Sequence, residues 1–402
     1  MLTKSSTHQN IRIGLAGAGS MGKGIAFQIH ATPGMNLAWV MDINHQAAAS
    51  TAALAPGAVH GTDFQQLLKE HPIDVLVEAT NSIGAAADYC LAAFDAGAHV
   101  VLMNAEVDLA LAPLLHHEAQ KRNLTVTSDA GDQHGVLATM IEEADLMGFD
   151  IVQAGNIKGF LNRYATPESI RHEAEIRNLS VTQCCAYTDG TKLHIEMAVL
   201  ANALGYLPPE GGMTGPRAKN VHEALGLFDF DSYGDSPRID YLLGAEPGGG
   251  VYLVVQPKKE LPAEQAFYLN YYKLGDGPYY LLYRPYHLCH LETPKAILAA
   301  VNGHAILSTS SQTCDVYAYA KCDLPAGTTI KHAIGSAEIY GLVEALDSKR
   351  IPIALLEEST TLKTPLRKDE PLTSKHIDLP DHRLTELRRR QQSLLQQTPN
   401  RP

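Results

Sequence analysis

The residues with the clearest chemical use form a glycine-rich run near the start of the chain, GLAGAGSMGKG. Gly17, Gly19 and Gly22 have the spacing G-x-G-x-x-G. In this spacing the first glycine permits a sharp turn, the second lets the backbone approach a pyrophosphate, and the third lets a helix pack closely on a strand. The amides of Ser20 and Met21 would face the phosphates from the helix start. The run predicts a dinucleotide-binding turn if a strand precedes it and a helix follows it.

The flanking residues supply two strands, a helix and an acid. Ile11–Ala16 is an apolar run typical of a buried parallel strand, residues 22–29 suit a helix, and Met35–Met41 is a second strand-like run. That run ends at Asp42, whose carboxylate would accept hydrogen bonds from an adenosine ribose and repel a 2′-phosphate. The following Ile43-Asn-His45 contains no Arg to receive such a phosphate. We therefore expect an NAD(P)(H) cofactor, with NAD favoured over NADP.

The alternation of strands and helices continues through the first third of the chain. Further strands are expected at residues 73–79, 99–103 and 124–127, and helices at residues 63–70, 84–96 and 113–122. This order predicts the α/β class with a doubly wound parallel sheet of the Rossmann type, which binds ligands beyond the carboxyl ends of its strands. Those ends contribute Thr80, Asn81, Asn104 and Glu106 as further cofactor-binding candidates, although Asn104 can equally be a turn residue.

The pattern changes after residue 134, which we take as the end of this first domain. Residues 135–310 mix helix-like and aromatic strand-like runs, which predicts an α+β substrate domain whose last helix, at 293–301, returns to the first sheet. Residues 311–380 read as short strands separated by turns, typical of a small β-rich domain. Residues 381–402 contain Arg388-Arg-Arg390 and several Gln, and we expect a polar, partly helical, solvated tail.

The composition favours a soluble globular protein, with 45% hydrophobic and 19% charged residues in a chain of 402. The net charge of −12 argues against a nucleic-acid-binding protein. The six Cys form no CxxC pair, and the first ten residues do not resemble a signal peptide. No apolar run approaches the ~20 residues needed to span a membrane. These features predict a cytoplasmic protein with reduced thiols and no membrane partner.

Several further stretches are distinctive together with the glycine-rich run. They are VVLMNAEVD (100–108), SDAGDQ (128–133), DGTK (189–192), GAEPGGG (244–250), GDGPYY (275–280) and YRPYH (283–287). The chain resembles, over nearly its whole length, the homoserine dehydrogenase-like oxidoreductases that carry a C-terminal SAF domain. The resemblance implies an NAD(P)-dependent enzyme for a small-molecule substrate, a SAF domain at residues 311–380, and a homo-oligomer.

One strand end separates two branches of that family. Homoserine dehydrogenases have Asn-Lys where this chain has Asn104-Ala-Glu106, and that Lys serves cofactor and substrate. An Asn-x-Glu at this place resembles the reductoisomerase-like branch, whose members convert 1-deoxyxylulose 5-phosphate to methylerythritol phosphate with NADPH. That reaction would need a divalent metal and a basic pocket for phosphate. The NADPH dependence of that branch disagrees with Asp42, so dehydrogenase and reductoisomerase both stay open.

Lys192 is the first candidate for the catalytic acid or base. Hydride transfer at a carbonyl needs a group that exchanges a proton with the oxygen, and a Lys in a water-excluded cleft can have a lowered pKa. In the alternative, Asp189 caps a helix at residues 189–204 and Lys192 forms an exposed pair with Glu196 worth only ~0.3–0.5 kcal/mol. A helix dipole disfavours a cation in the first turn, which favours a functional role for Lys192.

Other polar residues complete the candidate catalytic set of Lys192, Asp189 and Glu196. Lys158 lies near two glycines after an expected strand, where it would bind a substrate carboxylate or phosphate, or be a solvated loop Lys. Asp129 and Asp132 follow a strand of the first sheet and would contact a substrate hydroxyl or a metal, or cap the next helix.

A metal site at residues 287–292 is the weaker interpretation of a cluster of possible ligands. His287, His290 and Glu292 could ligate, but their spacing matches no standard site, and Thr293-Pro294 suits a helix start. We therefore expect no metal ligands there. Because a dinucleotide fold alone does not establish catalysis, a non-catalytic dinucleotide sensor is the rival from another class.

Overall fold

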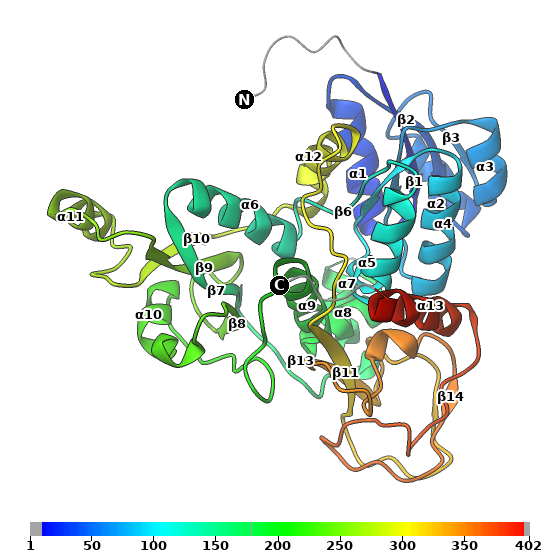
Figure 1. Cartoon of the computed structure of the whole chain (residues 1–402). Coiled ribbons are helices and arrows are strands. Elements are labelled where there is room, and N and C mark those ends of the chain that lie inside the picture. Colours follow the sequence, from blue (N-terminus) through cyan, green and yellow to red (C-terminus); the bar gives the residue numbers. More distant parts are fainter. Residues whose placement is uncertain (1–9, 178, 398–402) are drawn as a thin grey trace. The chain divides into compact units, whose positions relative to one another are not determined.

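The computed structural model describes residues 10–177 and 179–397, which divide into two compact units (Figure 1). Unit 1 contains the described residues up to Asp132, together with Leu288–Ser310 and the chain from Glu386 onward. Unit 2 contains Gln133–His287 and Ser311–Thr385. No helix within the described ranges is long and apolar enough to cross a membrane.

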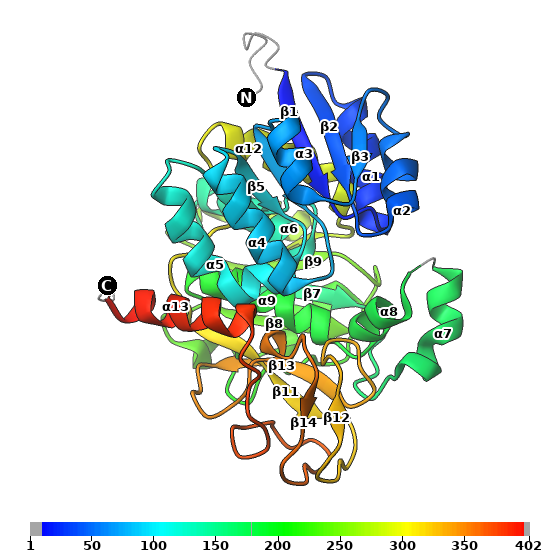
Figure 2. The same cartoon turned by 90° about the vertical axis from the view of Figure 1, so that its right-hand side faces the viewer.

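Unit 1 is built on a six-stranded parallel sheet with the strand order β3-β2-β1-β4-β5-β6 (Figure 2). The strands are β1 (Ile11–Ala16), β2 (Met35–Met41), β3 (Val59–Gly61), β4 (Val75–Glu78), β5 (His99–Leu102) and β6 (Val126–Ser128). The order reverses between β1 and β4, and a doubly wound sheet binds its ligand at such a switch point. The expected Rossmann-type sheet is confirmed.

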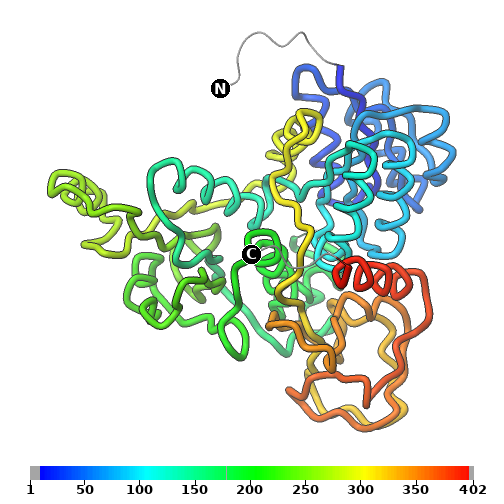
Figure 3. The backbone as a smooth tube through the Cα atoms, in the orientation of Figure 1, coloured from blue at the N-terminus to red at the C-terminus, as the bar shows by residue number. Residues whose placement is uncertain are grey.

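Helices connect these strands and cover the sheet of unit 1. They are α1 (Ser20–Ala31), α2 (His45–Ala52), α3 (Phe64–Glu70), α4 (Ile83–Asp95), α5 (Ala105–Gln120) and α12 (Cys289–Val301). The side chains of Asn44, Asp63, Ser82 and Asn104 cap α2, α3, α4 and α5 by accepting backbone amides. Helix α12 is the expected returning helix, and it lies beside α1 (Figure 3).

Helix α5 corrects the expected helix at residues 113–122. It begins at Ala105 and runs through Pro113, which we had placed at a helix start. Next to this proline, the Leu114 amide donates to Oε1 of Gln391 at 3.2 Å, and the Ala110 carbonyl accepts from Arg388 at 2.6 Å. Pro lacks an amide proton and crowds the preceding turn, so polar side chains from another segment are useful there.

The segment that supplies these side chains is helix α13 (Arg383–Gln397). Its residues Leu384, Leu387, Arg388 and Gln391 are buried, and Gln391 has no exposed surface. The expected polar tail is helical up to residue 397, but it is solvated on one side only, because its other side contacts α5. Residues 398–402 lie outside the described residues.

Unit 2 contains a four-stranded sheet with the order β10-β9-β7-β8. Its strands are β7 (Phe149–Lys158), β8 (Arg238–Leu243), β9 (Val251–Pro257) and β10 (Tyr280–Arg284). One face packs into an apolar cluster that includes Ile157, Tyr252 and Phe230. Helix α6 (Gln133–Leu146) packs on β7 and β9, and Figure 1 shows α6 and α10 (Ala224–Leu227) on opposite sides of this sheet.

Unit 2 also contains a buried helix, α9 (Thr191–Leu204), and a number of shorter elements. They are α7 (Pro167–Ile176), α8 (Val181–Thr188), η1 (Val221–Glu223), η2 (Phe230–Tyr233), α11 (Ala263–Tyr271), β11 (Cys314–Ala320), β12 (Thr329–Ile330), β13 (Ile339–Ala345), η3 (Ile353–Leu355) and β14 (Thr360–Thr361). Strands β11 and β13 pair in antiparallel fashion and pack on α9. Residues 311–380, which we expect from the sequence to form a separate domain, belong to unit 2 together with this helix.

Candidate cofactor and catalytic sites

Of the three glycines in the glycine-rich turn, only Gly19 has open space at its Cβ position. Gly17 has φ +104°, and a Cβ there would lie 2.4 Å from the Ala79 carbonyl oxygen. A Cβ on Gly22 would lie 2.0 Å from the Gly17 carbonyl oxygen, so this glycine lets α1 pack closely. Gly19 has no atom within 4 Å of its Cβ position. The first and third glycines thus serve the fold, while the second leaves the backbone open to a pyrophosphate.

The start of α1 completes an anion-binding site. Gly19 is the N-cap and offers no side chain, and the first turn contains no acidic residue. The amides of Ser20, Met21 and Gly22 therefore lie at the positive end of the helix without a side-chain cap. Ser20 is exposed and Met21 is partly exposed, which suits contact with a ligand. These residues fit the pyrophosphate of a dinucleotide.

Asp42 lies beside this turn, at the end of β2. Its Oδ2 accepts a hydrogen bond of 2.7 Å from the Ala18 amide, and its Oδ1 accepts one of 2.8 Å from the Asn44 amide. Both bonds hold the carboxylate next to the glycine-rich turn while it remains partly exposed. A carboxylate in this place can accept from ribose hydroxyls.

The ends of β4 and β5 carry a second polar group of residues. Glu78 is fully buried, and burial raises its pKa to about 7, with the charge of Glu106 acting in the same direction. Its Oε1 accepts the Thr80 amide at 2.8 Å, while Asn104 caps α5 by accepting the amides of Glu106 and Val107. The turn-residue interpretation of Asn104 thus describes its main contacts. Asn81 is exposed at the same strand end.

Glu78 was missed in the sequence analysis, although the strand end that contains it was recognised. The available signal was an acid at the last position of an apolar strand, where a parallel sheet buries most side chains. A carboxyl with a pKa raised toward neutrality is typical of functional sites as well as of tightly packed strand ends.

The end of β6 holds the two acidic candidates of unit 1. Asp129 is fully buried, and its Oδ2 accepts the amides of Gly131 at 2.7 Å and Asp132 at 3.2 Å. Its Oδ1 accepts the hydroxyl of Thr293 at 2.8 Å, and burial raises its pKa to about 7. Asp129 therefore ties β6 to α12. Asp132 is partly exposed, with Oδ1 3.8 Å from Cys289 Sγ.

A small pocket beside β6 contains another carboxyl that the sequence analysis did not select. Asp108 lines it together with Ser128 and Ser308. The Ser128 hydroxyl donates to Asp108 Oδ2 at 2.5 Å, and burial raises the pKa of Asp108 to about 6. His116, two turns farther along α5, lies with Nδ1 2.8 Å from Ser308 Oγ. The Ile306 amide donates to Thr127 Oγ1 at 2.7 Å and the Leu307 carbonyl accepts the Ser128 amide at 3.0 Å, so residues 306–308 are attached to the edge of the sheet.

Lys192 lies in the first turn of α9, in unit 2. From Thr191 to Asn202 every residue of α9 is buried except Lys192, which is partly exposed. Its ammonium lies 5.8 Å from the centre of the Tyr187 ring. Glu196, one turn farther along, is only 2% exposed. Lys158 is partly exposed at the end of β7, where its carbonyl accepts the Gly244 amide at 2.7 Å.

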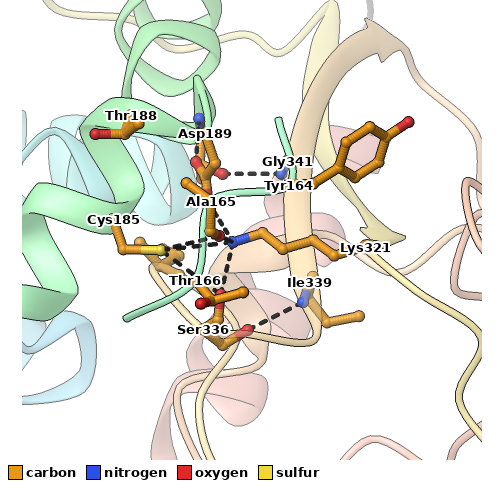
Figure 4. A network of polar contacts seen from close by, with 12 residues as sticks. Tyr164, Ala165, Thr166, Cys185, Thr188, Asp189, Lys321, Ser336, Ile339 and Gly341 are labelled. Atoms are coloured by element: carbon orange, nitrogen blue, oxygen red, sulfur yellow. Dashed lines mark hydrogen bonds and ion pairs between the residues drawn. The ribbon is translucent and has the colours of Figure 1, made fainter. Parts of the chain in front are cut away.

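Asp189 occupies a different position from the expected helix cap. It is the C-cap of α8, and α9 begins at Thr191 after Gly190, which has φ +88°. Its Oδ1 accepts the Thr191 amide at 2.8 Å, and its Oδ2 forms an ion pair of 2.8 Å with Lys321 (Figure 4). Because both oxygens are engaged within the protein, the contacts of Asp189 are those of a positioning residue.

The candidate catalytic residues divide between the units: Asp129 and Asp132 belong to unit 1, and Lys158, Asp189, Lys192 and Glu196 belong to unit 2. The metal alternative gains no support from His290 and Glu292. Both lie within α12, which begins four residues before Thr293, and in the described chain neither joins a group of three possible ligands. The ring of His290 packs 2.5 Å from the Cβ position of Gly24.

Comparisons with known proteins describe two consecutive segments. Residues 17–128 match the family model described as homoserine dehydrogenase, NAD binding domain, and residues 131–293 match the one described as oxidoreductase DRL, catalytic domain. A sequence search of curated proteins finds no match.

Solved structures with similar folds include three inositol dehydrogenases. They are scyllo-inositol dehydrogenase from Lactobacillus casei (13% identity, TM-score 0.45, 76% of this chain and 92% of that chain), myo-inositol 2-dehydrogenase from Lactobacillus plantarum (12%, 0.41, 73% and 90%), and the Lactobacillus casei myo-inositol dehydrogenase complex with NAD(H) and myo-inositol (15%, 0.39, 63% and 74%).

The two family matches agree with the geometry of unit 1. The first match begins at Gly17 of the glycine-rich turn and includes β2 to β6 of the sheet. The second begins shortly after β6 and runs through the first part of unit 2 into α12. The expected enzyme class is confirmed. The protein is an NAD(P)-dependent oxidoreductase with an NAD-binding domain of the homoserine dehydrogenase type followed by an oxidoreductase catalytic domain.

Proposed function

We propose that the protein transfers a hydride between NAD(H) and a small polar hydroxy or keto compound, with Lys192 exchanging the proton at the substrate oxygen. The nicotinamide, when bound, supplies or accepts the hydride. The observation that carries the proposal is the partial exposure of Lys192 in a helix that is otherwise buried from Thr191 to Asn202. Lys192 is thus the one residue of this stretch that reaches the surface.

The surroundings of Lys192 suit proton exchange. The positive end of α9 disfavours a protonated Lys in the first turn, and this favours release of the proton. Glu196 lies one helical turn away, at a spacing that lets a carboxylate stabilise the ammonium form. Lys158, at the end of β7, would bind an anionic group of the substrate.

Asp42 supports NAD(H) as the cofactor, because its carboxylate is fixed beside the glycine-rich turn by the amides of Ala18 and Asn44. A 2′-phosphate would meet this negative charge. Separate titrations with NADH and NADPH test the preference. Tighter binding of NADH supports it, and a preference for NADPH would contradict it.

Turnover is tested with a set of polyols, hydroxy acids and keto acids, following the absorbance of the reduced nicotinamide. Lys192→Ala should abolish turnover of any active compound and leave the affinity for NADH unchanged, because the glycine-rich turn belongs to unit 1. Lys219→Ala, at an exposed position of unit 2, is the matched control and should be active. A non-catalytic sensor would bind NADH and turn over none of these compounds.

A sugar-phosphate reductoisomerase is the second candidate, and the proximity of Glu106 to Glu78 favours it. The charge of Glu106 contributes to the raised pKa of Glu78, and two neighbouring carboxyls are suited to a divalent cation. This reaction predicts turnover of 1-deoxyxylulose 5-phosphate that is lost with EDTA and restored by Mg²⁺ or Mn²⁺. Turnover that EDTA leaves unchanged would exclude this candidate.

A further inference from the structure

Lys321 follows β11 and has its ammonium group enclosed within unit 2. Its side chain is 2% exposed. The ammonium donates hydrogen bonds of 2.6 Å to the carbonyl oxygens of Ala165 and Ser336, and pairs with Asp189 Oδ2 at 2.8 Å (Figure 4). Cys185 Sγ lies 3.6 Å away. Three oxygens thus match the three protons that an ammonium group can donate.

These partners come from segments that are distant in the sequence. Ala165 precedes α7 and Ser336 precedes β13. Cys185 lies within α8, and Asp189 is the C-cap of that helix. A buried charge is costly unless paired, and removing one member of a buried pair leaves the other uncompensated. An apolar residue would hold the same segments together without the desolvation cost of a buried charge. The presence of a Lys here therefore points to a role other than holding them together.

The ion pair leads directly to the first turn of α9. Asp189 Oδ1 accepts the Thr191 amide at 2.8 Å while its Oδ2 is held by Lys321. Thr191 Oγ1 in turn accepts the Gly341 amide of β13 at 2.9 Å. The turn itself depends on Gly190, whose φ of +88° is a conformation that L residues rarely adopt. The turn that carries Lys192 is therefore held by two residues of the C-terminal segment, residues 311–385: Lys321 through Asp189, and Gly341 through Thr191.

We propose that Lys321 is a positioning residue for catalysis, acting through Asp189 to hold the first turn of α9 and the direction of Lys192. The proposal rests on the proposed role of Lys192. It gives residues 311–385 a part in the reaction although none of them is a candidate for contact with substrate. A displacement of about 1 Å of a catalytic group can cost on the order of 100-fold in rate.

The alternative, a purely structural Lys321, is separated from positioning by a control at the other end of the same helix. Asn202 is 4% exposed, and its Oδ1 accepts the Thr313 and Cys314 amides at 2.8 and 3.0 Å. Asn202→Ala therefore also removes buried polar contacts between α9 and the C-terminal segment. It lies three turns away from Lys192, so it should lower stability without changing the first turn.

The experiment compares Lys321→Gln with Asn202→Ala in the full chain by hydrogen exchange, NADH titration and turnover. Lys321→Gln should speed exchange of the Thr191 amide at least tenfold and lower kcat about 100-fold, with NADH affinity unchanged. Asn202→Ala should lower the melting temperature and keep kcat within threefold. If Lys321→Gln does not fold, Lys321→Arg, which keeps the charge with a different shape, should show the same two effects at smaller size.

Two results would overturn the proposal. Unchanged exchange of the Thr191 amide in both Lys321 variants would show that the ion pair does not hold the turn. Faster exchange with wild-type kcat would show that holding it has no catalytic consequence. Failure of the proposed function itself would look different. In that case Lys192→Ala would be fully active, or the wild-type protein would turn over no compound. Hydrogen exchange of the Thr191 amide would still show whether Lys321 holds the turn.

Discussion

The hydroxyl of Thr293 donates a 2.8 Å hydrogen bond to Oδ1 of Asp129, and this contact joins a helix that returns late in the chain to a strand end formed much earlier. The bond belongs to a carboxyl that has no exposed surface. Its oxygens accept two backbone amides and this hydroxyl, all within unit 1. Asp129 is therefore central to the cohesion of unit 1, whatever its role toward a substrate.

The raised pKa of Asp129 predicts that stability depends on pH. Its pKa is about 7 in the folded protein and ~3.9 in an unfolded chain, so between these values the folded state binds more protons. The stabilisation that Asp129 contributes should be complete below about pH 4 and should decline as the pH rises toward 7. Glu78, also about 7, acts in the same direction.

Melting temperatures measured at pH 5.5 and pH 7.5 check this dependence, and we expect the lower pH to give a value about 5 °C higher. Asp129→Asn keeps the shape and most of the hydrogen-bonding pattern but cannot ionise, so it should reduce the difference. Asp235→Asn, at an exposed position, should leave the difference unchanged. A melting temperature that rises between pH 5.5 and 7.5 in the wild-type protein would contradict the prediction.

The position of Asp42 predicts that replacing it changes the preference between NADH and NADPH. Asp42→Ala removes the charge that would repel a 2′-phosphate, so the ratio of NADPH to NADH affinity should rise about tenfold or more. The gain for NADPH should be smaller than the loss for NADH, since no Arg follows in residues 43–45. Fluorescence titration of both nucleotides measures the two affinities. Equal affinity for both nucleotides in the wild-type protein would show that Asp42 does not read the ribose.

Adding a side chain should have different effects at Gly19 and at Gly22. A Cβ on Gly19 meets no atom within 4 Å, so Gly19→Val should keep the melting temperature and lower NADH affinity at least tenfold by blocking the pyrophosphate. A Cβ on Gly22 would meet the Gly17 carbonyl oxygen at 2.0 Å, so Gly22→Ala should lower the melting temperature by several degrees. NADH binding that survives Gly19→Val would place the pyrophosphate elsewhere.

The contacts of Gln391 predict that α13 stabilises α5. Its Oε1 accepts the Leu114 amide at 3.2 Å, and its Nε2 donates to the Ala110 carbonyl at 3.2 Å. Gln391→Ala leaves these groups with fewer partners and should cost about 1–3 kcal/mol of unfolding free energy. Gln392→Ala, at the exposed neighbouring position, should be within about 0.5 kcal/mol of the wild-type protein in urea denaturation. Equal stability of the two variants would contradict this account.

The cofactor site was predictable from the sequence because each requirement of a dinucleotide turn is local. Gly17, Gly19 and Gly22 act through the absence of a side chain, and Asp42 follows them at a characteristic distance in the chain. The flanking strands were recognised from their apolar runs, and β1 and β2 were placed with the bounds that the structure shows. Periodicity and composition suffice for such a unit.

Contacts between distant segments were not predictable in the same way. The partner of Asp189 is Lys321, and nothing near either residue in the sequence indicates the other. Helix α13 looked like a solvated tail because its burial depends on Arg388 and Gln391 meeting α5. A strong local signal was also misleading at Pro113, since tertiary contacts allow α5 to continue through a proline that would end an isolated helix.

The division of the chain has a consequence for biosynthesis. Unit 1 is assembled from the first strands, from α12 and from α13, with all of unit 2 encoded in the intervals between them. On the ribosome the sheet of unit 1 emerges early. It lacks α12, which covers part of it, and the side chains of α13 that contact α5 near Pro113, until nearly the whole described chain has been made. Nascent chains usually fold domain by domain from the N-terminus, but this sheet must wait for the last helix. During that interval its uncovered apolar surface is exposed to chaperones, and a stop codon placed before α13 should damage unit 1 more than unit 2.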